Sequence, residues 1–264
     1  MKIVETEAII LNSYSLAEAD KIILLFTKQS GLVRLSVRGA KRLKNRFGGR
    51  LEPFTVADIV YAQKEDAELG RLVGAETLES HFHLATRLNV LNALSYLSKL
   101  LMVMTPVHEP NEVLYRMVKA CLEAIASVKD DLAAARLVVS YFEIWLLRLT
   151  GFLPDFRTCS KCRSRIGSKT VYYWAVDAQL ICQDCTTSNR RGEILAPQIQ
   201  KLIRAALVQP PLKFVEMADH LNVKRDDLDT ITHRLLRKII EFEPDYWSND
   251  LELEEAAQSR PKVA

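Results

Sequence analysis

The sequence predicts an α+β protein with several domains, in which a β-rich part comes first and a helical part follows. Apolar and polar residues alternate, or β-branched residues cluster, through the first eighty of the 264 residues. From His83 onward, apolar residues recur at intervals of three and four, which is the period of a helix. Two Cys-x-x-Cys pairs interrupt that helical pattern. The predicted domains are a β-barrel over residues 1–80 and a helical domain over 81–264, with a four-cysteine module inserted at about 155–192.

The composition is that of an ordinary globular chain, with 48% hydrophobic and 26% charged residues. No apolar run is long enough to span a bilayer, and acidic residues stand near the start where a signal peptide needs an apolar block. We therefore expect a cytoplasmic protein with no membrane partner. The net charge is only +3, so any charged partner must be inferred from where the charges lie.

Five strands are expected in the β-rich part. The turn Gln29-Ser30-Gly31 joins the second and third strands, since Gly31 can adopt a positive φ. Five strands in about eighty residues without a long helix are typical of an oligonucleotide-binding (OB-type) barrel, although another small β-barrel fits the same pattern. The expected strands are Ile3–Leu11, Lys21–Thr27, Leu32–Val37, Leu51–Tyr61 and Arg71–Leu78.

A basic run lies between the third and fourth expected strands. It holds seven basic residues and no acidic residue: Arg34, Arg38, Lys41, Arg42, Lys44, Arg46 and Arg50. Such a run predicts binding to nucleic-acid phosphates with strong salt dependence and little sequence preference. Phe47 and Tyr14 are candidate faces for stacking on bases. Three other aromatic residues fall within apolar strand patterns and are assigned to the barrel core: Phe26, Phe54 and Tyr61.

The helical part is expected to form a bundle. A first helix ends at Thr105-Pro106, a second follows Pro110-Asn111, and the third, Leu132–Thr150, is apolar on several faces and is therefore expected at the centre. Cys121 lies in the apolar stripe of the second helix and is interpreted as a buried residue. The last expected helices are Gln198–Leu207, Lys213–Leu221 and Asp226–Phe242. Seven acids and no base follow between Glu241 and Glu255, before an expected disordered tail.

The most specific chemical pattern is formed by Cys159, Cys162, Cys182 and Cys185. Two Cys-x-x-Cys pairs separated by a hairpin-length run predict one structural Zn²⁺ ion per chain. Two short disulfides would require an oxidising compartment, and a redox Cys-x-x-Cys is expected only once. Four thiolates leave no open position for water, and no Walker loop, nucleophile elbow or His-Glu-x-x-His motif is present, so no catalytic residues are expected. His81 and His83 are interpreted as domain-boundary residues rather than ligands.

Several of these residues together resemble the RecO family of bacterial recombination mediators. The resemblance is carried by Tyr14, Glu18, Asp20, Leu25-Phe26-Thr27, Gly31 and Gly39-Ala40-Lys41-Arg42, and it continues through the helical region to Leu149–Phe156 and the cysteine pairs. Ala17 stands where that pattern commonly has glycine. Some RecO-like proteins lack the four cysteines, so the metal site does not define the family.

The resemblance implies a non-enzymatic DNA repair protein associated with the nucleoid. Such proteins bind single- and double-stranded DNA, anneal complementary strands and assist loading of RecA onto strands coated by single-strand-binding protein. The implied partners are RecR and the acidic C-terminal tail of single-strand-binding protein, with RecA affected indirectly. The residues leave two alternatives open: a zinc-containing transcription regulator that reads duplex DNA through a helix-turn-helix-like segment at Leu221–Ile240, and a zinc-thiolate redox sensor.

Overall fold

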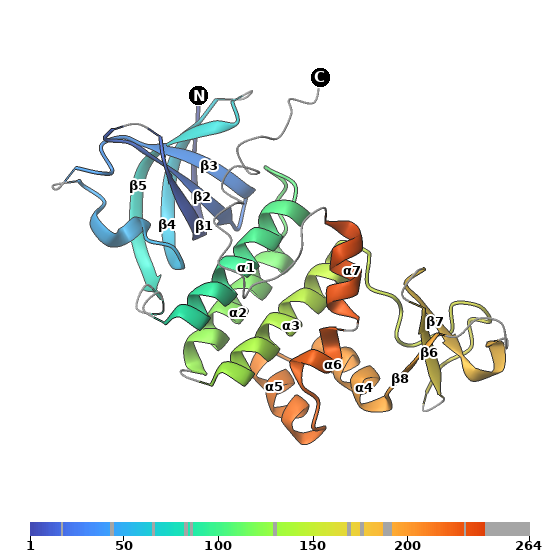
Figure 1. The fold of residues 1–264 in the computed structure, drawn as a ribbon. Helices are drawn as coiled ribbons and strands as arrows, with labels where there is room; N and C mark the ends of the chain where they lie inside the picture. Colours follow the sequence, from blue (N-terminus) through green and yellow to red (C-terminus); the bar gives the residue numbers. More distant parts are fainter. Residues whose placement is uncertain are drawn as a thin grey trace.

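The computed structural model places a barrel at one end of the molecule, a group of helices in the middle and a small sheet at the other end (Figure 1). Among the described residues, no helix combines the length and the apolar character needed to cross a membrane. The structure describes residues 1–16, 18–42, 45–64, 67–81, 84, 87–128, 131–167, 170–174, 177–186, 192–229 and 231–240.

The barrel is closed, with its strands in the order β1-β2-β3-β5-β4. The β3–β5 pair is parallel and the other pairs are antiparallel. Its interior is filled by alternate apolar side chains, among them Ile10, Leu25, Leu35 and Ile59. The strands are β1 (Lys2–Ser15), β2 (Lys21–Thr27), β3 (Gly31–Val37), β4 (Thr55–Gln63) and β5 (Leu69–Ser80).

The fourth expected strand begins later than its sequence pattern indicates. We expected it to start at Leu51, but Gly48–Leu51 forms a 3-10 turn, η1, and the strand starts at Thr55. Phe54 has a φ of 65°, which interrupts an extended backbone. The Phe54 N–H instead donates to the Ile10 carbonyl at 2.7 Å, so the chain enters the barrel through a sharp turn.

One outer side of the barrel belongs to the main hydrophobic core. Leu24 and Phe26 of β2 and Ile9 of β1 pack in the same apolar cluster as α1 and α2. Phe26, Phe54 and Tyr61 are all buried, but the prediction that they form the barrel core is confirmed for Tyr61 and wrong for the other two. Only Tyr61 lies inside the barrel, because Phe26 and Phe54 fill the space between the barrel and the helices.

Gly31 allows the barrel to approach the loop between α1 and α2. Its φ is +62°, and a Cβ atom built on it would lie 2.1 Å from the Glu109 carbonyl oxygen. Beside it, the His108 N–H donates to the Leu32 carbonyl at 3.1 Å. No side chain fits in this contact without moving backbone atoms.

We therefore expect Gly31→Ala to lower the free energy of unfolding by about 2–4 kcal/mol, from left-handed backbone strain and overpacking together. Urea unfolding followed by circular dichroism measures the loss. Gly74→Ala is the matched control, because a Cβ atom added to Gly74 would have its nearest neighbour 3.6 Å away, an ordinary contact. Equal unfolding midpoints for the two variants would contradict this role of Gly31.

Helix α3 is the centre of the helical part, as its sequence predicts. Its buried residues include Val138, Phe142, Ile144 and Leu147, which face several directions. The other helices pack around it. The helices are α1 (Leu88–Met104), α2 (Glu112–Ser127), α3 (Leu132–Leu149), α4 (Pro197–Ala206), α5 (Pro211–His220), α6 (Arg225–Asp229) and α7 (Thr232–Ile239). Cys121 of α2 is fully buried, which confirms its assignment to the core, and burial raises its pKa.

The single helix expected over Asp226–Phe242 is wrong, because the chain forms two short helices, α6 and α7. The Ile231 N–H donates to the Leu228 carbonyl, which tightens the turn between them. This turn brings Arg225 of α6 and Thr232 of α7 to the same carboxylate, that of Glu143 on α3. Glu241 and Phe242 lie outside the described residues.

That carboxylate is the centre of a buried polar network. Glu143 has no exposed surface and Arg225 only 4%. The Glu143 Oε1 atom accepts from Arg225 Nη2 at 2.8 Å and from the Tyr96 hydroxyl at 2.7 Å, and Oε2 accepts from the Thr232 hydroxyl at 2.8 Å. Arg225 also contacts Asp229, at 2.7 Å through Nε. The network connects α1, α3, α6 and α7.

A second polar contact joins the barrel to α2. Lys119 Nζ lies 3.3 Å from Glu7 Oε1 on β1 and 3.0 Å from Glu79 Oε1 on β5. The Tyr115 hydroxyl donates to the same Glu7 oxygen at 3.1 Å. His81 Nε2 lies 3.7 Å from Glu79 Oε2, while His83 lies outside the described residues.

A small antiparallel sheet is inserted between α3 and α4, in the order β7-β6-β8. Tyr173 and Leu180 belong to the main hydrophobic core, so the sheet is attached to the helices. Ile181 and Trp174 pack instead against cysteines in a separate small cluster. The elements are β6 (Val171–Trp174), β7 (Gln179–Cys182), η3 (Gln183–Cys185) and β8 (Glu193–Leu195).

Candidate metal centre and nucleic-acid interface

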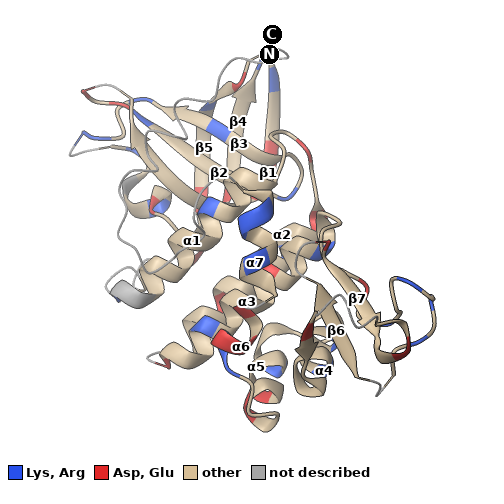
Figure 2. Ribbon diagram, turned by 45° about the vertical axis from the view of Figure 1, so that its right-hand side comes forward, with Lys and Arg blue, Asp and Glu red and all other residues tan. Residues whose placement is uncertain are grey.

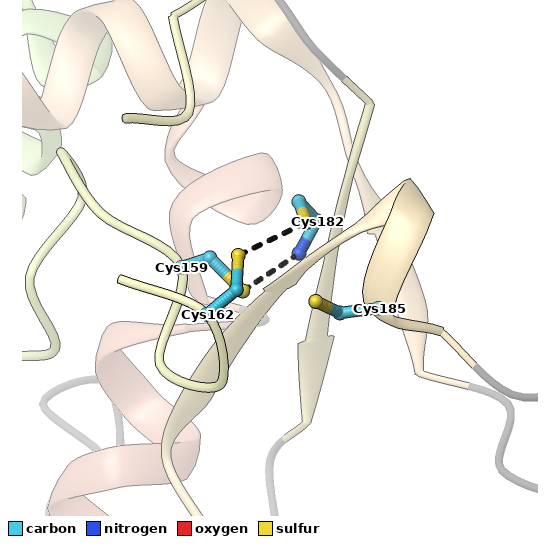
Figure 3. A group of neighbouring side chains, drawn as sticks. All are labelled: Cys159, Cys162, Cys182 and Cys185. Atoms are coloured by element: carbon cyan, nitrogen blue, oxygen red, sulfur yellow. Dashed lines mark hydrogen bonds between the residues drawn. The ribbon is translucent and has the colours of Figure 1, made fainter. Parts of the chain in front are cut away.

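The four cysteines predicted to bind a metal converge at one point (Figure 3). Cys159 and Cys162 lie in a turn, Cys182 ends β7, and Cys185 follows in η3. All four Sγ atoms lie within 4.8 Å of one another, and those of Cys162 and Cys182 are 3.8 Å apart. In a tetrahedral site with metal–sulfur bonds of about 2.3 Å, sulfur atoms are about 3.8 Å apart. The cluster can therefore hold one metal ion.

Hydrogen bonds favour the thiolate form of two of these cysteines, Cys159 and Cys162. The Ser164 hydroxyl lies 3.0 Å from Cys162 Sγ, and this contact is the main cause that lowers the pKa of Cys162 to about 6. Burial opposes ionisation of Cys159, but backbone N–H groups, including that of Cys182 at 3.4 Å, outweigh burial and lower its pKa. The hydrogen bond to Cys162 raises the pKa of Cys185 to about 12. A cation at the centre would favour the thiolate form of all four.

Basic residues are frequent on the segment that carries the first cysteine pair. Arg157, Lys161, Arg163 and Arg165 all lie on this segment and are exposed. Figure 2 shows basic residues on a loop beside β7. Lys161 Nζ lies 3.5 Å from the Cys185 carbonyl oxygen. These cations offset the negative charge that four thiolates would leave around a divalent metal ion.

The predicted basic run begins in β3 and continues as a loop, of which Leu43 and Lys44 lie outside the described residues. We call the residues from Arg38 to Arg50 the basic loop. The Gly39 N–H donates to Asp20 Oδ1 at 2.8 Å, and the Lys41 N–H donates to the Ala19 carbonyl at 3.0 Å. Six of the seven predicted residues are exposed, and Lys44 lies outside the described residues; the six are Arg34, Arg38, Lys41, Arg42, Arg46 and Arg50.

Phe47 is not a stacking face, contrary to our expectation. It is 5% exposed and packs in the barrel core. The Arg46 guanidinium lies 4.5 Å above its ring, and Arg46 Nη2 donates to the Val73 carbonyl at 2.6 Å. Phe47 and Arg46 thus attach the basic loop to the barrel. Tyr14 is half-buried, with its hydroxyl 3.7 Å from Met102 Sδ.

Arg71 adds a cation that the sequence pattern did not assign to this surface. It is exposed on β5 and is paired in register with Ser36 of β3, two residues from Arg34. Strand alternation puts Ser36 and Arg34 on the same outer face. OB-type barrels commonly bind ligands through strands 2 and 3. Here Leu24 and Phe26, on the outer side of β2, are buried against the helices. The outer surface that remains accessible is therefore that of β3 and its neighbour β5.

Comparisons with known proteins cover almost the whole described chain. Residues 1–81 match the model described as "Recombination protein O N terminal", and residues 86–244 match "Recombination protein O C terminal". A DNA repair protein RecO from Koribacter versatilis is 32% identical over 178 residues, which are 67% of this chain and 70% of the relative. Proteins with the same description from Syntrophobacter fumaroxidans and Thermodesulfovibrio yellowstonii are each 31% identical, over 70% and 69% of this chain and 72% and 70% of the relatives.

Proposed function

Because the chain belongs to the RecO family of DNA repair proteins, we propose that it is a recombination mediator that binds DNA and anneals complementary single strands. The observation that carries the proposal is the exposed basic loop beside Arg34 and Arg71. We further propose that the barrel is of OB type, which its closed five-stranded order supports.

Annealing by this surface needs no chemical step. Phosphates of a strand would be neutralised by the exposed cations of the basic loop, with release of counterions. Neutralisation lowers the repulsion between two strands, and contacts limited to the backbone leave base edges accessible for pairing. We therefore propose a binding protein and not an enzyme, with single- and double-stranded DNA as its ligands.

The metal is proposed to be Zn²⁺ in a structural role. Four thiolates suit zinc, and a complete set of protein ligands leaves no position for a reacting water. The separate apolar cluster of Cys159, Ile181, Cys182 and Trp174 is small. Metal ligation would add the stability that such a cluster lacks.

The partners proposed from the family are RecR, the acidic tail of single-strand-binding protein and, indirectly, RecA. A protein that brings strands together but performs no reaction itself would act together with such partners. We also propose a cytoplasmic location in association with the nucleoid, where these partners and DNA occur together.

The alternative of a duplex-reading transcription regulator is less well supported. Helix α6 has only five residues, and Leu228, Leu235 and Leu236 of the helix-turn-helix-like segment are buried. A recognition helix must present its side chains to the major groove. A strong preference for one duplex sequence over single strands would favour this alternative.

Replacing Arg38, Lys41 and Arg42 together with alanine should weaken binding to single strands of every sequence. Three lost phosphate contacts should reduce the slope of log K against log salt by about 2. Arg46 is better kept in this variant, because it also attaches the basic loop to the barrel. Fluorescence anisotropy with labelled oligonucleotides at several salt concentrations measures both quantities. The control replaces three exposed bases elsewhere with alanine: Arg116, Lys213 and Lys224.

The same two variants test the function in an annealing assay with complementary strands, with and without single-strand-binding protein. The wild-type chain and the control should accelerate annealing, and the basic-loop variant should be slower at equal protein concentration. Unchanged affinity and salt slope in a basic-loop variant that is still folded would rule out this DNA surface. Absence of annealing by the wild-type chain would contradict the proposed function itself.

A further inference from the structure

A groove lies between the end of α3, the segment 153–157 and α4. Its volume is about 730 Å³, and three arginines line it: Arg148, Arg157 and Arg204. We call it the arginine groove. Apolar and aromatic side chains complete the lining, including Trp145, Leu153 and Phe156. The groove therefore combines cations with an apolar floor.

The arginines of the groove are available to a ligand. Within the described part of the chain, none of the three guanidinium groups forms an ion pair. Among the described lining residues Asp155 is the one acid, and its carboxylate already accepts from the Arg157 N–H and the Thr158 hydroxyl. A complementary ligand would be an acidic peptide that also carries aromatic or aliphatic residues.

This chain contains a segment with that chemistry. Residues 241–255 hold seven acids and no base, and Phe242, Tyr246 and Trp247 lie among them. These residues lie outside the described part of the structure, which stops at Ile240.

The segment starts close to the groove. Ile239 and Ile240 line a neighbouring cavity of about 470 Å³, and Leu149 lines both that cavity and the arginine groove. An extended chain advances about 3.3 Å per residue, so Trp247 can be about 20 Å from Ile240. Because Leu149 lines both cavities, a chain that leaves Ile240 along the first cavity reaches the arginine groove past Leu149.

We propose that residues 241–255 bind in the arginine groove of their own chain. The carboxylates pair with Arg148, Arg157 and Arg204, and Tyr246 and Trp247 cover the apolar floor. The bound segment is a competitive inhibitor in cis, so another acidic and apolar peptide binds the groove only when the segment is displaced. This mechanism is independent of the basic loop and of DNA binding.

The test uses full-length chains and a labelled peptide with the sequence of residues 241–255. In the open variant, all seven acids of the segment are replaced by their amides: Glu241→Gln, Glu243→Gln, Asp245→Asn, Asp250→Asn, Glu252→Gln, Glu254→Gln and Glu255→Gln. A tethered segment has an effective concentration of about 1 mM, so a peptide with a Kd of about 100 µM should bind the wild-type chain about tenfold more weakly than the open variant. Fluorescence anisotropy at low salt measures both affinities.

Two further variants of the open chain locate the site. Reversing Arg148, Arg157 and Arg204 to glutamate should weaken peptide binding at least tenfold, whereas reversing Arg116, Lys213 and Lys224 should leave it within twofold. In the wild-type background, the groove reversal should also accelerate amide exchange of residues 242–247. Equal peptide affinity for the wild-type chain and the open variant would overturn the proposal. So would loss of binding on replacing Arg38, Lys41 and Arg42, because the segment would then cover the basic loop.

Discussion

Replacing Glu143 with glutamine should lower the free energy of unfolding by about 3–5 kcal/mol, because it removes the fully buried counter-charge of Arg225 and leaves only Asp229, which is 34% exposed, to pair with the guanidinium. Glutamine preserves the shape of the side chain, so the loss reports the charge and its hydrogen bonds. The Glu143 carboxylate accepts from groups on three other helices, α1, α6 and α7. We therefore expect the loss in global stability, measured by urea unfolding, and not in a local transition.

Asp226→Asn is the matched control for that experiment. Asp226 pairs with Arg136 at 3.3 Å, but its side chain is 78% exposed, so the loss should be below about 1 kcal/mol. Replacing both members of the buried pair, with Glu143→Leu and Arg225→Met, should recover part of the stability, since neither buried charge remains and Asp229, which is 34% exposed, can be hydrated. A loss of stability for Glu143→Gln as small as that of Asp226→Asn would show that the network contributes little.

Replacing Cys159 and Cys182 with serine should abolish metal binding and unfold the four-cysteine module. Thiolate zinc sites contribute about 10–16 kcal/mol in small zinc-finger peptides, far more than the few apolar contacts of this cluster can supply. Elemental analysis measures the metal content, and hydrogen exchange over residues 157–186 measures the local order. Protection should be lost there first, while α2 and α3 remain protected.

Cys121→Ala is the control, because Cys121 is not one of the four clustered cysteines and is buried among apolar residues of the main core. It should retain one metal ion per chain. Removing the metal from the wild-type chain with a chelator should cause the same loss of local order as the double cysteine substitution. Retention of stoichiometric metal by that double variant would contradict the assigned site. Reversible metal loss under mild oxidant, with a matching loss of DNA binding, would instead favour the redox-sensor alternative.

Patterns of local spacing predicted most elements of the fold. The strand alternation and the helical period depend on neighbours in sequence, and the five strands and the central helix α3 follow from them. The convergence of four cysteines was also predictable, because each Cys-x-x-Cys pair forms its own turn.

Features that depend on contacts between residues far apart in the sequence could not be predicted from local spacing. Glu143 stands in an apolar helix without a visible partner in sequence, and Arg225 is 82 positions away. Phe47 is surrounded by basic residues in the sequence, yet its ring contacts the barrel interior. Arg71 reaches the basic surface only through the parallel pairing of β3 with β5. Each outcome is decided by tertiary packing, which overrides the local pattern.

The shared core between the barrel and the helices has a mechanical consequence. Leu24, Phe26 and Leu32 pack in the same apolar cluster as residues of α1 and α2, and Lys119 holds β1 and β5 to α2 by two ion pairs. The barrel and the helices are therefore joined by packed side chains and ion pairs as well as by the connection that follows β5. A force applied to the basic loop would be transmitted to the helices through this packed contact, so that the barrel and the helices would turn together.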